Sequence, residues 1–241
     1  MTMVEIPGAS PPLQACLARP EGAGPWPGVV VLHDALGMSH DLRAQTKWLA
    51  GAGYLAAGPD LYRGKAGLRC MIAVARAVTR GEGQAFLDVE ATRAWLATRE
   101  DCTKKIAVLG FCLGGGFALA LAPRSHGFSA SSVNYGGLME EAETQLKTAC
   151  PIVASYGAKD KGLRGSAARL EGILSEAGVA HDVHEYPDAG HAFLNDHDLR
   201  EVPAIFRFMS WATGGSGYHG PSAEDARRRI LAFFAAHLRD E

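Results

Sequence analysis

The sequence lacks the features by which a chain spans a membrane, is secreted or binds nucleic acid. It contains no run of about 18 consecutive apolar residues, the length that a membrane-spanning helix needs. Its N-terminus has no basic segment followed by an apolar stretch, so we expect no signal peptide. No lysine- and arginine-rich block occurs, and the net charge is only −2. These absences predict a cytoplasmic protein that binds neither nucleic acid nor membranes.

Paired cysteine motifs are absent as well. No C-x-x-C pair occurs among the five cysteines, which are Cys16, Cys70, Cys102, Cys112 and Cys150. Their odd number and scattered positions argue against a disulfide framework or a structural zinc site and fit a reducing compartment. We expect no metal and no cofactor, and an unpaired thiol could carry out chemistry in such a compartment.

The residues that are present have the composition of an ordinary globular protein. Hydrophobic residues make up 47% of the 241 residues and charged residues 21%. Short apolar runs alternate with helical stretches, which predicts a mostly parallel central sheet with helices on both faces. We expect one α/β domain over residues 1–241 that is a monomer or a weak homo-oligomer.

The order of elements follows from the apolar patterns and the turn residues. An antiparallel hairpin at a sheet edge is expected around residues 4–17, where apolar residues alternate with polar ones. Further strands are expected at 28–33, 54–57, 106–109, 129–135, 152–156 and 181–186. Helices are expected at 39–50, 68–80, 82–99, 117–122, 163–177, 198–211 and 222–238.

One segment joins a predicted strand to a predicted helix through a glycine-rich turn. Gly110-Phe111-Cys112-Leu113-Gly114 has the form G-x-nucleophile-x-G, with cysteine where serine usually stands. A strand that turns at once into a helix strains the middle residue, and glycines two positions away let the turn close. The helix N-terminus beneath Cys112 would favour thiolate over thiol. We therefore predict that Cys112 is a nucleophile.

Two other interpretations of this turn remain open but weaker. Cys112 could be a buried structural cysteine without a chemical role. A dinucleotide-phosphate loop fits poorly, because G-x-G-x-x-G is not matched and no Asp or Glu stands about 20 residues further on.

Polar residues follow three predicted strands at the edge of the sheet where ligands bind. These residues are Cys112, Asp160 and His191, and their order along the chain is that of α/β-hydrolases. His191 would hold Cys112 as a thiolate and later protonate the leaving oxygen. Asp160 would fix the tautomer of His191 and stabilise its charged form. Asp188, on the same loop as His191, is a weaker rival of Asp160.

The segment after the first buried strand is expected to complete this site. It stands where α/β-hydrolases place the second oxyanion donor, so the backbone N–H groups of Ala35 and Leu113 would form an oxyanion hole. Asp34 would point into the site beside Cys112, where its charge would disfavour the thiolate. A helix N-cap is an equally good interpretation of Asp34.

Taken together, these segments resemble the dienelactone hydrolase family from about residue 13 to the C-terminus. The shared motifs are Gly110-Phe-Cys-Leu-Gly-Gly114, His33-Asp34-x-x-Gly37, Pro59-Asp60-Leu61-Tyr62, Gly157-x-x-Asp160 and Ala189-Gly190-His191-x-Phe193. The resemblance implies an α/β-hydrolase fold without a separate lid domain and a Cys-His-Asp esterase or lactonase. In that family a carboxylate, usually glutamate, accepts the hydrogen bond of the thiol until substrate binds. The matching residue here is the shorter Asp34.

The chain departs from the family at the binding site for a substrate carboxylate. Dienelactone-specific members use two arginines, one of them three or four residues after the histidine, where this chain reads Phe193-Leu194-Asn195. The other would come from the helical insert, where the candidates are Arg63, Arg69, Arg76 and Arg80, and we favour Arg69 because it opens the helix nearest the strand ends. Because only one of the two arginines that bind the substrate carboxylate would be present, we expect the substrate to be a small ester or lactone related to dienelactone rather than dienelactone itself. Asp196, His197 and Asp198 are expected to form a solvated charged loop.

Two other functions remain as alternatives. A class I glutamine amidotransferase also uses G-x-C-x-G, but it carries His-x-Glu at the base position, where this chain has His191-Ala192-Phe193. A non-catalytic binding protein on a hydrolase scaffold would keep the fold without a reactive thiol.

Overall fold

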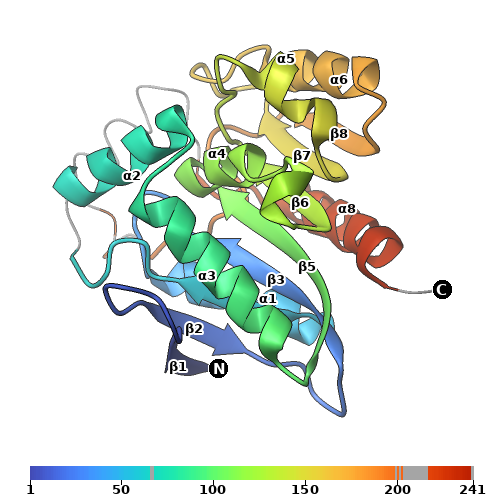
Figure 1. Ribbon diagram of the computed structural model, residues 1–241. Helices are drawn as coiled ribbons and strands as arrows, with labels where there is room; N and C mark the ends of the chain where they lie inside the picture. Colours follow the sequence, from blue (N-terminus) through green and yellow to red (C-terminus); the bar gives the residue numbers. More distant parts are fainter. Residues whose placement is uncertain (66–67, 199, 201, 203–216, 240–241) are drawn as a thin grey trace.

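The computed structural model describes residues 1–65, 68–198, 200, 202 and 217–239. Figure 1 shows a twisted sheet running through the molecule with helices on both of its faces. No helix within these ranges is long and apolar enough to cross a membrane. The helix expected at 198–211 lies almost entirely outside the described residues.

The sheet has the spatial order β1-β2-β4-β3-β5-β6-β7-β8. The strands are β1 (Thr2–Glu5), β2 (Gln14–Ala18), β3 (Trp26–Leu32), β4 (Leu55–Pro59), β5 (Cys102–Phe111), β6 (Ala130–Asn134), β7 (Ile152–Gly157) and β8 (His181–Tyr186). β1 and β2 pair antiparallel at one edge, β2 joins β4 antiparallel, and the pairs from β4 through β8 are parallel. The predicted edge hairpin and mostly parallel sheet are confirmed.

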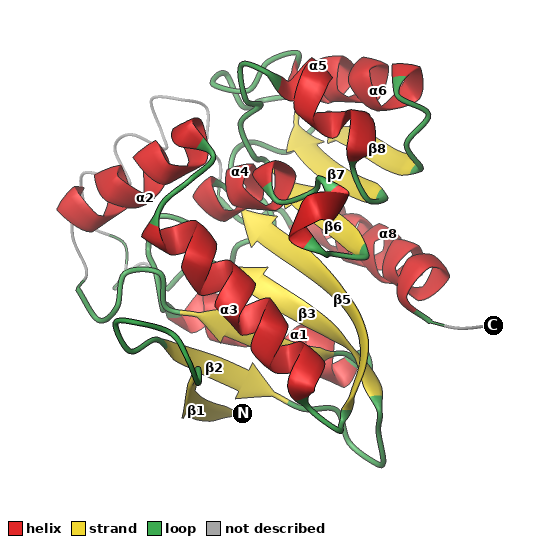
Figure 2. Ribbon diagram, viewed as in Figure 1, coloured by secondary structure: helices red, strands yellow, loops and turns green. Residues whose placement is uncertain are grey.

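Helices cover both faces because the central strands are apolar on both sides. The helices are α1 (His40–Gly51), α2 (Leu68–Arg80), α3 (Gln84–Thr98), α4 (Leu113–Ala120), α5 (Ala142–Gln145), α6 (Ser166–Glu176) and α8 (Gly220–Leu238), with short 3-10 turns η1 (Arg124–His126) and η2 (Leu146–Thr148). Val30 and Leu32 belong to a hydrophobic cluster that includes residues of α2, α3, α4 and α6, whereas Val29 and Val31 belong to a second cluster that includes residues of α1 and α8. Figure 2 shows these two helical layers on either side of the strands.

The elements around the predicted nucleophile are longer than the sequence pattern suggests. β5 runs from Cys102 to Phe111 rather than over 106–109, and α4 begins at Leu113 rather than at 117. Glycine is a poor helix former, yet three glycines stand in the first turn of α4. Close packing of this turn against neighbouring strand ends overrides their low propensity, as described below. The α/β-hydrolase fold class is confirmed.

Candidate active site

The turn between β5 and α4 holds Cys112 in a strained backbone conformation. Its φ of 54° and ψ of −111° lie in a region that a residue with a side chain rarely adopts. The backbone N–H of Cys112 donates to Asn134 O at the end of β6 over 3.0 Å, and its carbonyl accepts from Gly116 N in α4. Bonds to a strand and to a helix therefore hold the residue on the turn, at the carboxyl edge of the sheet.

Two glycines let this turn close. A Cβ on Gly110 would lie 1.9 Å from the carbonyl oxygen of Gly114, within the turn itself. A Cβ on Gly114 would lie 2.5 Å from the carbonyl oxygen of Leu32 and 2.6 Å from that of His33. The absence of a side chain at Gly114 thus brings the start of α4 against the end of β3.

The structure brings Cys112, Asp160 and His191 together from three separate loops. His191 Nε2 lies 3.0 Å from Cys112 Sγ, and His191 Nδ1 lies 2.6 Å from Asp160 Oδ2. The other carboxylate oxygen of Asp160 accepts the backbone N–H of Gly162 over 2.9 Å. The Asp160 side chain is only 3% exposed, whereas His191 is 27% exposed. This arrangement can pass a proton between the sulfur and a reactant while the carboxylate holds the imidazole in place.

These contacts also set the protonation of His191. Burial by itself lowers the pKa of the imidazole, because it disfavours the charged form. The hydrogen bonds to Asp160 and Cys112 and the charges of both groups outweigh burial and raise the pKa of His191 to about 10. The imidazolium is therefore the stable form of His191 at neutral pH.

Asp188, the rival of Asp160, lies away from this cluster. Its carboxylate is 75% exposed and is 3.4 Å from the ammonium group of Lys159. The carboxylate that contacts the His191 imidazole is therefore that of Asp160.

The two predicted oxyanion donors are Ala35, in the loop after β3, and Leu113, the first residue of α4. The close approach at Gly114 brings these two segments together. Across the described part of the chain, neither backbone N–H donates to a protein acceptor. Both groups therefore remain free to bind an oxyanion.

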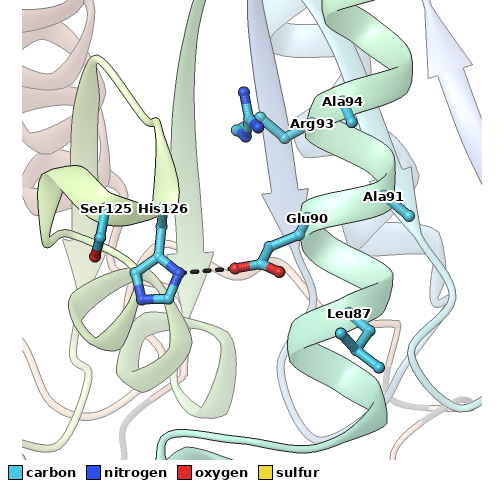
Figure 3. A pocket seen from close by; sticks show the side chains of 7 residues that line it. All are labelled: Leu87, Glu90, Ala91, Arg93, Ala94, Ser125 and His126. Atoms are coloured by element: carbon cyan, nitrogen blue, oxygen red, sulfur yellow. Dashed lines mark hydrogen bonds and ion pairs between the residues drawn. The ribbon is translucent and has the colours of Figure 1, made fainter.

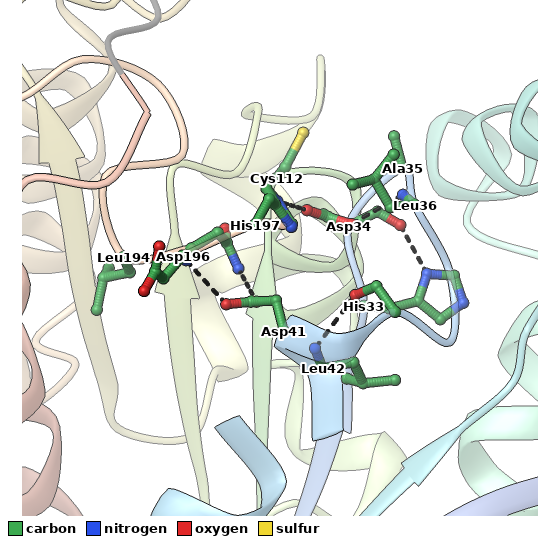
Figure 4. Close-up of polar contacts among 12 residues, drawn as sticks. His33, Asp34, Ala35, Leu36, Asp41, Leu42, Cys112, Leu194, Asp196 and His197 are labelled. Carbon is green, nitrogen blue, oxygen red and sulfur yellow. Dashed lines mark hydrogen bonds and ion pairs between the residues drawn. The ribbon is translucent and has the colours of Figure 1, made fainter. Parts of the chain in front are cut away.

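Asp34 pairs with His197 and not with the thiol. Its Oδ2 lies 2.7 Å from His197 Nε2, and its Oδ1 accepts the backbone N–H of Leu36 over 2.8 Å (Figure 4). No hydrogen bond joins Asp34 to Cys112 within the described residues. The expectation that His197 is solvated is wrong, because its side chain is only 17% exposed. Asp196 is exposed as expected, so His197 is the residue of this segment that turns toward the interior.

A buried polar network holds the loop that follows His191. Asn195 lies in the segment after His191 that contains no arginine, and its amide donates to Asp41 Oδ2 over 2.5 Å. Asp41 also accepts the backbone N–H of Asp196 over 2.9 Å, as Figure 4 shows. Tyr135 donates to the amide oxygen of Asn195, and its ring meets that of His191 edge-on at 5.2 Å. Sequence reasoning missed this network because its members carry no recognisable spacing.

Other candidate features lie apart from this site. Arg69 belongs to the first turn of α2, but its side chain is outside the described part of the structure. A surface groove of about 440 Å³ runs between α3 and η1, where His126 pairs with Glu90 (Figure 3). None of the predicted site residues lines it. Within the described ranges, no three potential metal ligands cluster together.

Comparison with known families gives a match along nearly the whole chain. The model of the dienelactone hydrolase family matches residues 13–238. A Yersinia pestis protein provisionally named carboxymethylenebutenolidase is 27% identical over 248 residues, covering 96% of this chain and 86% of that protein. A similar protein from Methylorubrum extorquens, with the same provisional name, is 26% identical over 219 residues, covering 83% of this chain and 75% of its own.

Solved structures share the fold. A Klebsiella pneumoniae crystal structure, provisionally described as a dienelactone hydrolase, superposes with a TM-score of 0.76 at 26% identity and covers 97% of both chains. The dienelactone hydrolase-like promiscuous phosphotriesterase P91, from metagenomic libraries, superposes with a TM-score of 0.77 at 19% identity. The match covers 99% of this chain and 98% of the P91 chain.

Proposed function

The chain belongs to the dienelactone hydrolase family and is a carboxylic ester or lactone hydrolase, and from this premise we propose that it acts through an acyl-thioester on Cys112. The observation that carries the proposal is the chain of contacts from Cys112 Sγ to His191 over 3.0 Å and on to Asp160 over 2.6 Å. His191 serves as general base and acid, and Asp160 orients it.

Acylation begins with the thiolate of Cys112 beside the imidazolium of His191. Sγ attacks the carbonyl carbon of the ester, and the carbonyl oxygen becomes an oxyanion that accepts hydrogen bonds from the N–H groups of Ala35 and Leu113. As the tetrahedral intermediate collapses, the bond to the alkoxide breaks and His191 Nε2 gives its proton to the leaving oxygen. The products are an alcohol and an acyl-thioester, or for a lactone a single hydroxyacyl-thioester.

Deacylation uses the same groups in reverse. Neutral His191 takes a proton from water while the water oxygen attacks the thioester carbonyl. The second oxyanion forms in the same position, and its collapse expels the thiolate of Cys112. The carboxylic acid leaves, and the imidazolium–thiolate pair is restored next to Asp160.

We propose a small ester or lactone without an obligatory carboxylate as the substrate class. Asn195, in the segment after His191 that contains no arginine, is 2% exposed and has its amide bound to Asp41, so it cannot hold a substrate carboxylate. Arg69 remains our candidate for a single cationic contact. Asp34 is proposed to modulate the thiol by its charge, through the field of its pair with His197 rather than by a hydrogen bond.

The direct test is hydrolysis of p-nitrophenyl acetate by the Cys112→Ala variant. We expect loss of essentially all enzymatic turnover, because no other group can form the acyl intermediate. Cys102→Ala is the matched control, because this thiol lies at the opposite end of β5 from Cys112. The variant should keep the parent rate. Turnover that survives in Cys112→Ala would refute the proposed mechanism.

A further inference from the structure

Hydrogen bonds hold the backbone and the side chains of the loop after β3. His33 Nδ1 lies 2.6 Å from the carbonyl oxygen of Asp34. Because a carbonyl oxygen only accepts, the proton of the neutral imidazole is on Nδ1. The hydroxyl of Tyr62 donates to the carbonyl oxygen of Ala35 over 3.2 Å, and the carboxylate of Asp34 accepts from Leu36 N. The N–H of Ala35 has no protein acceptor among the described residues.

The carbonyl that His33 binds and the N–H of Ala35 belong to the same peptide group. A peptide group is planar and trans, so its C=O and N–H point in opposite directions. Fixing the oxygen of Asp34 therefore fixes the direction of the N–H of Ala35. A hydrogen bond to the carbonyl also polarises the peptide and makes its N–H a stronger donor. Tyr62 restrains the next peptide, so the N–H is held from both sides.

Histidine is an unusual residue at a buried position whose only requirement is packing. The His33 side chain is 2% exposed, and its Nε2 is buried without a hydrogen-bond partner. A buried polar atom without a partner destabilises the folded state, whereas an apolar side chain would avoid this penalty. Burial lowers the pKa of His33 and keeps it neutral, despite the carbonyl of Asp34 and nearby carboxylates that act in the other direction. The bond to the Asp34 carbonyl is the contact that accounts for its presence.

Tyr62 packs against the same loop. Its ring meets His33 edge-on, with 4.6 Å between ring centres, and it occupies the space beside Gly37, where a Cβ would lie 2.7 Å from the ring. Burial raises the pKa of the Tyr62 hydroxyl, and the charges of Asp34 and Cys112 raise it further. The hydroxyl therefore stays protonated and acts as a donor to the carbonyl oxygen of Ala35.

We propose that His33 and Tyr62 are positioning residues that preorganise the oxyanion hole, with His33 aiming the N–H of Ala35 through the carbonyl of Asp34. This inference rests on the proposed function and adds to it the side chains that hold one of its two backbone donors. Neither residue takes part in proton transfer to the substrate.

The test compares two reactions of Cys112. Ester hydrolysis needs an oxyanion hole, whereas alkylation by iodoacetamide is a displacement at a saturated carbon and needs only the thiolate. In His33→Leu we expect kcat for p-nitrophenyl acetate to fall on the order of 10²-fold, as for loss of one oxyanion donor. The alkylation rate should stay within about twofold of the parent, because the Cys112–His191–Asp160 contacts are untouched.

Further variants separate positioning from packing. His33→Asn places an amide N–H near the position of Nδ1 and should restore most of kcat. Tyr62→Phe should lower kcat by about 3–10-fold, the value of one neutral hydrogen bond, again with normal alkylation. Tyr54→Phe removes a hydroxyl that is buried without a hydrogen-bond partner away from this loop, and it should match the parent.

The outcomes distinguish this inference from the proposed function. Parental kcat in both His33→Leu and Tyr62→Phe, in an enzyme whose turnover depends on Cys112, would overturn the positioning role alone. Equal losses of hydrolysis and alkylation would also overturn it, because the defect would then lie in the thiol. Absence of Cys112-dependent hydrolysis in the parent would overturn the proposed function itself. Should His33→Leu fail to fold, His33→Asn and Tyr62→Phe still give the comparison.

Discussion

The protonation of His191 depends on Asp160, and this dependence can be measured. The pKa of His191 is about 10 in the folded protein, above the value of about 6.5 for an unfolded chain. A raised pKa contributes stability that is fully present below pH 6.5 or so and is lost as pH rises through about 10. In Asp160→Asn the hydrogen bond to a charged acceptor is lost, and the pKa of His191 should fall.

We therefore expect the parent to exceed Asp160→Asn in free energy of unfolding at pH 6, with a difference that shrinks toward pH 10. Urea unfolding at a series of pH values measures this difference. The variant should also lose on the order of 10²–10⁴-fold in kcat. Asp188→Asn is the control, because that carboxylate is exposed on the same loop. A difference that stays constant from pH 6 to pH 10 would contradict the raised pKa.

Individual site residues differ in how far the sequence could predict them. Cys112, Asp160 and His191 each follow a strand of a parallel sheet, so topology alone brings their backbones to one edge. His197 could not be placed in this way. Its burial depends on how the segment around Asn195 packs against Asp41 in α1, which is a contact between residues 154 positions apart.

At the scale of elements, the turn between β5 and α4 depends on glycine. Gly114→Ala would place a Cβ 2.5 Å from the backbone oxygen of Leu32, which cannot move without disturbing β3. We expect a loss of about 3 kcal/mol in stability, the upper end of overpacking costs, with a large loss of ester hydrolysis.

The matched control is Gly172→Ala in α6, where a Cβ would meet nothing within 4 Å. Because alanine is the better helix former, this variant should gain about 0.5–1 kcal/mol. Thermal unfolding of both variants provides the measurement. A Gly114→Ala protein as stable and active as the parent would show that the end of β3 does not constrain the turn between β5 and α4.

Most elements could be predicted because their patterns are local. α1 begins at His40 after Ser39, whose hydroxyl accepts the N–H of Leu42, and both the cap and the apolar face are visible in the sequence. The start of α4 was predicted too late because its first turn, Gly114–Gly116, has low helix propensity. What forms that turn is close contact with β3 and with Gly136, and this contact is not a local property.

At the scale of the whole molecule, one continuous sheet brings the parts of the site together. β3, β5, β7 and β8 are parallel members of the sheet, and each is followed by a loop that contributes to the site: Ala35, Cys112, Asp160 and His191. Because the hydrogen-bonded strands extend from β1 to β8, we propose that residues 1–241 form one domain. Changes far from Cys112 that disturb strand order would then affect the site as a unit.

The central claim is that an acyl group passes through the sulfur that this fold places beside His191. The most direct measurement is mass spectrometry of enzyme quenched with acid during turnover of a slowly hydrolysed ester, followed by peptide mapping. The account predicts one acyl group per chain on the peptide that contains Cys112, released by neutral hydroxylamine and absent from Cys112→Ala. An acyl group on another residue, or Cys112→Ala that still turns over the ester, would contradict it.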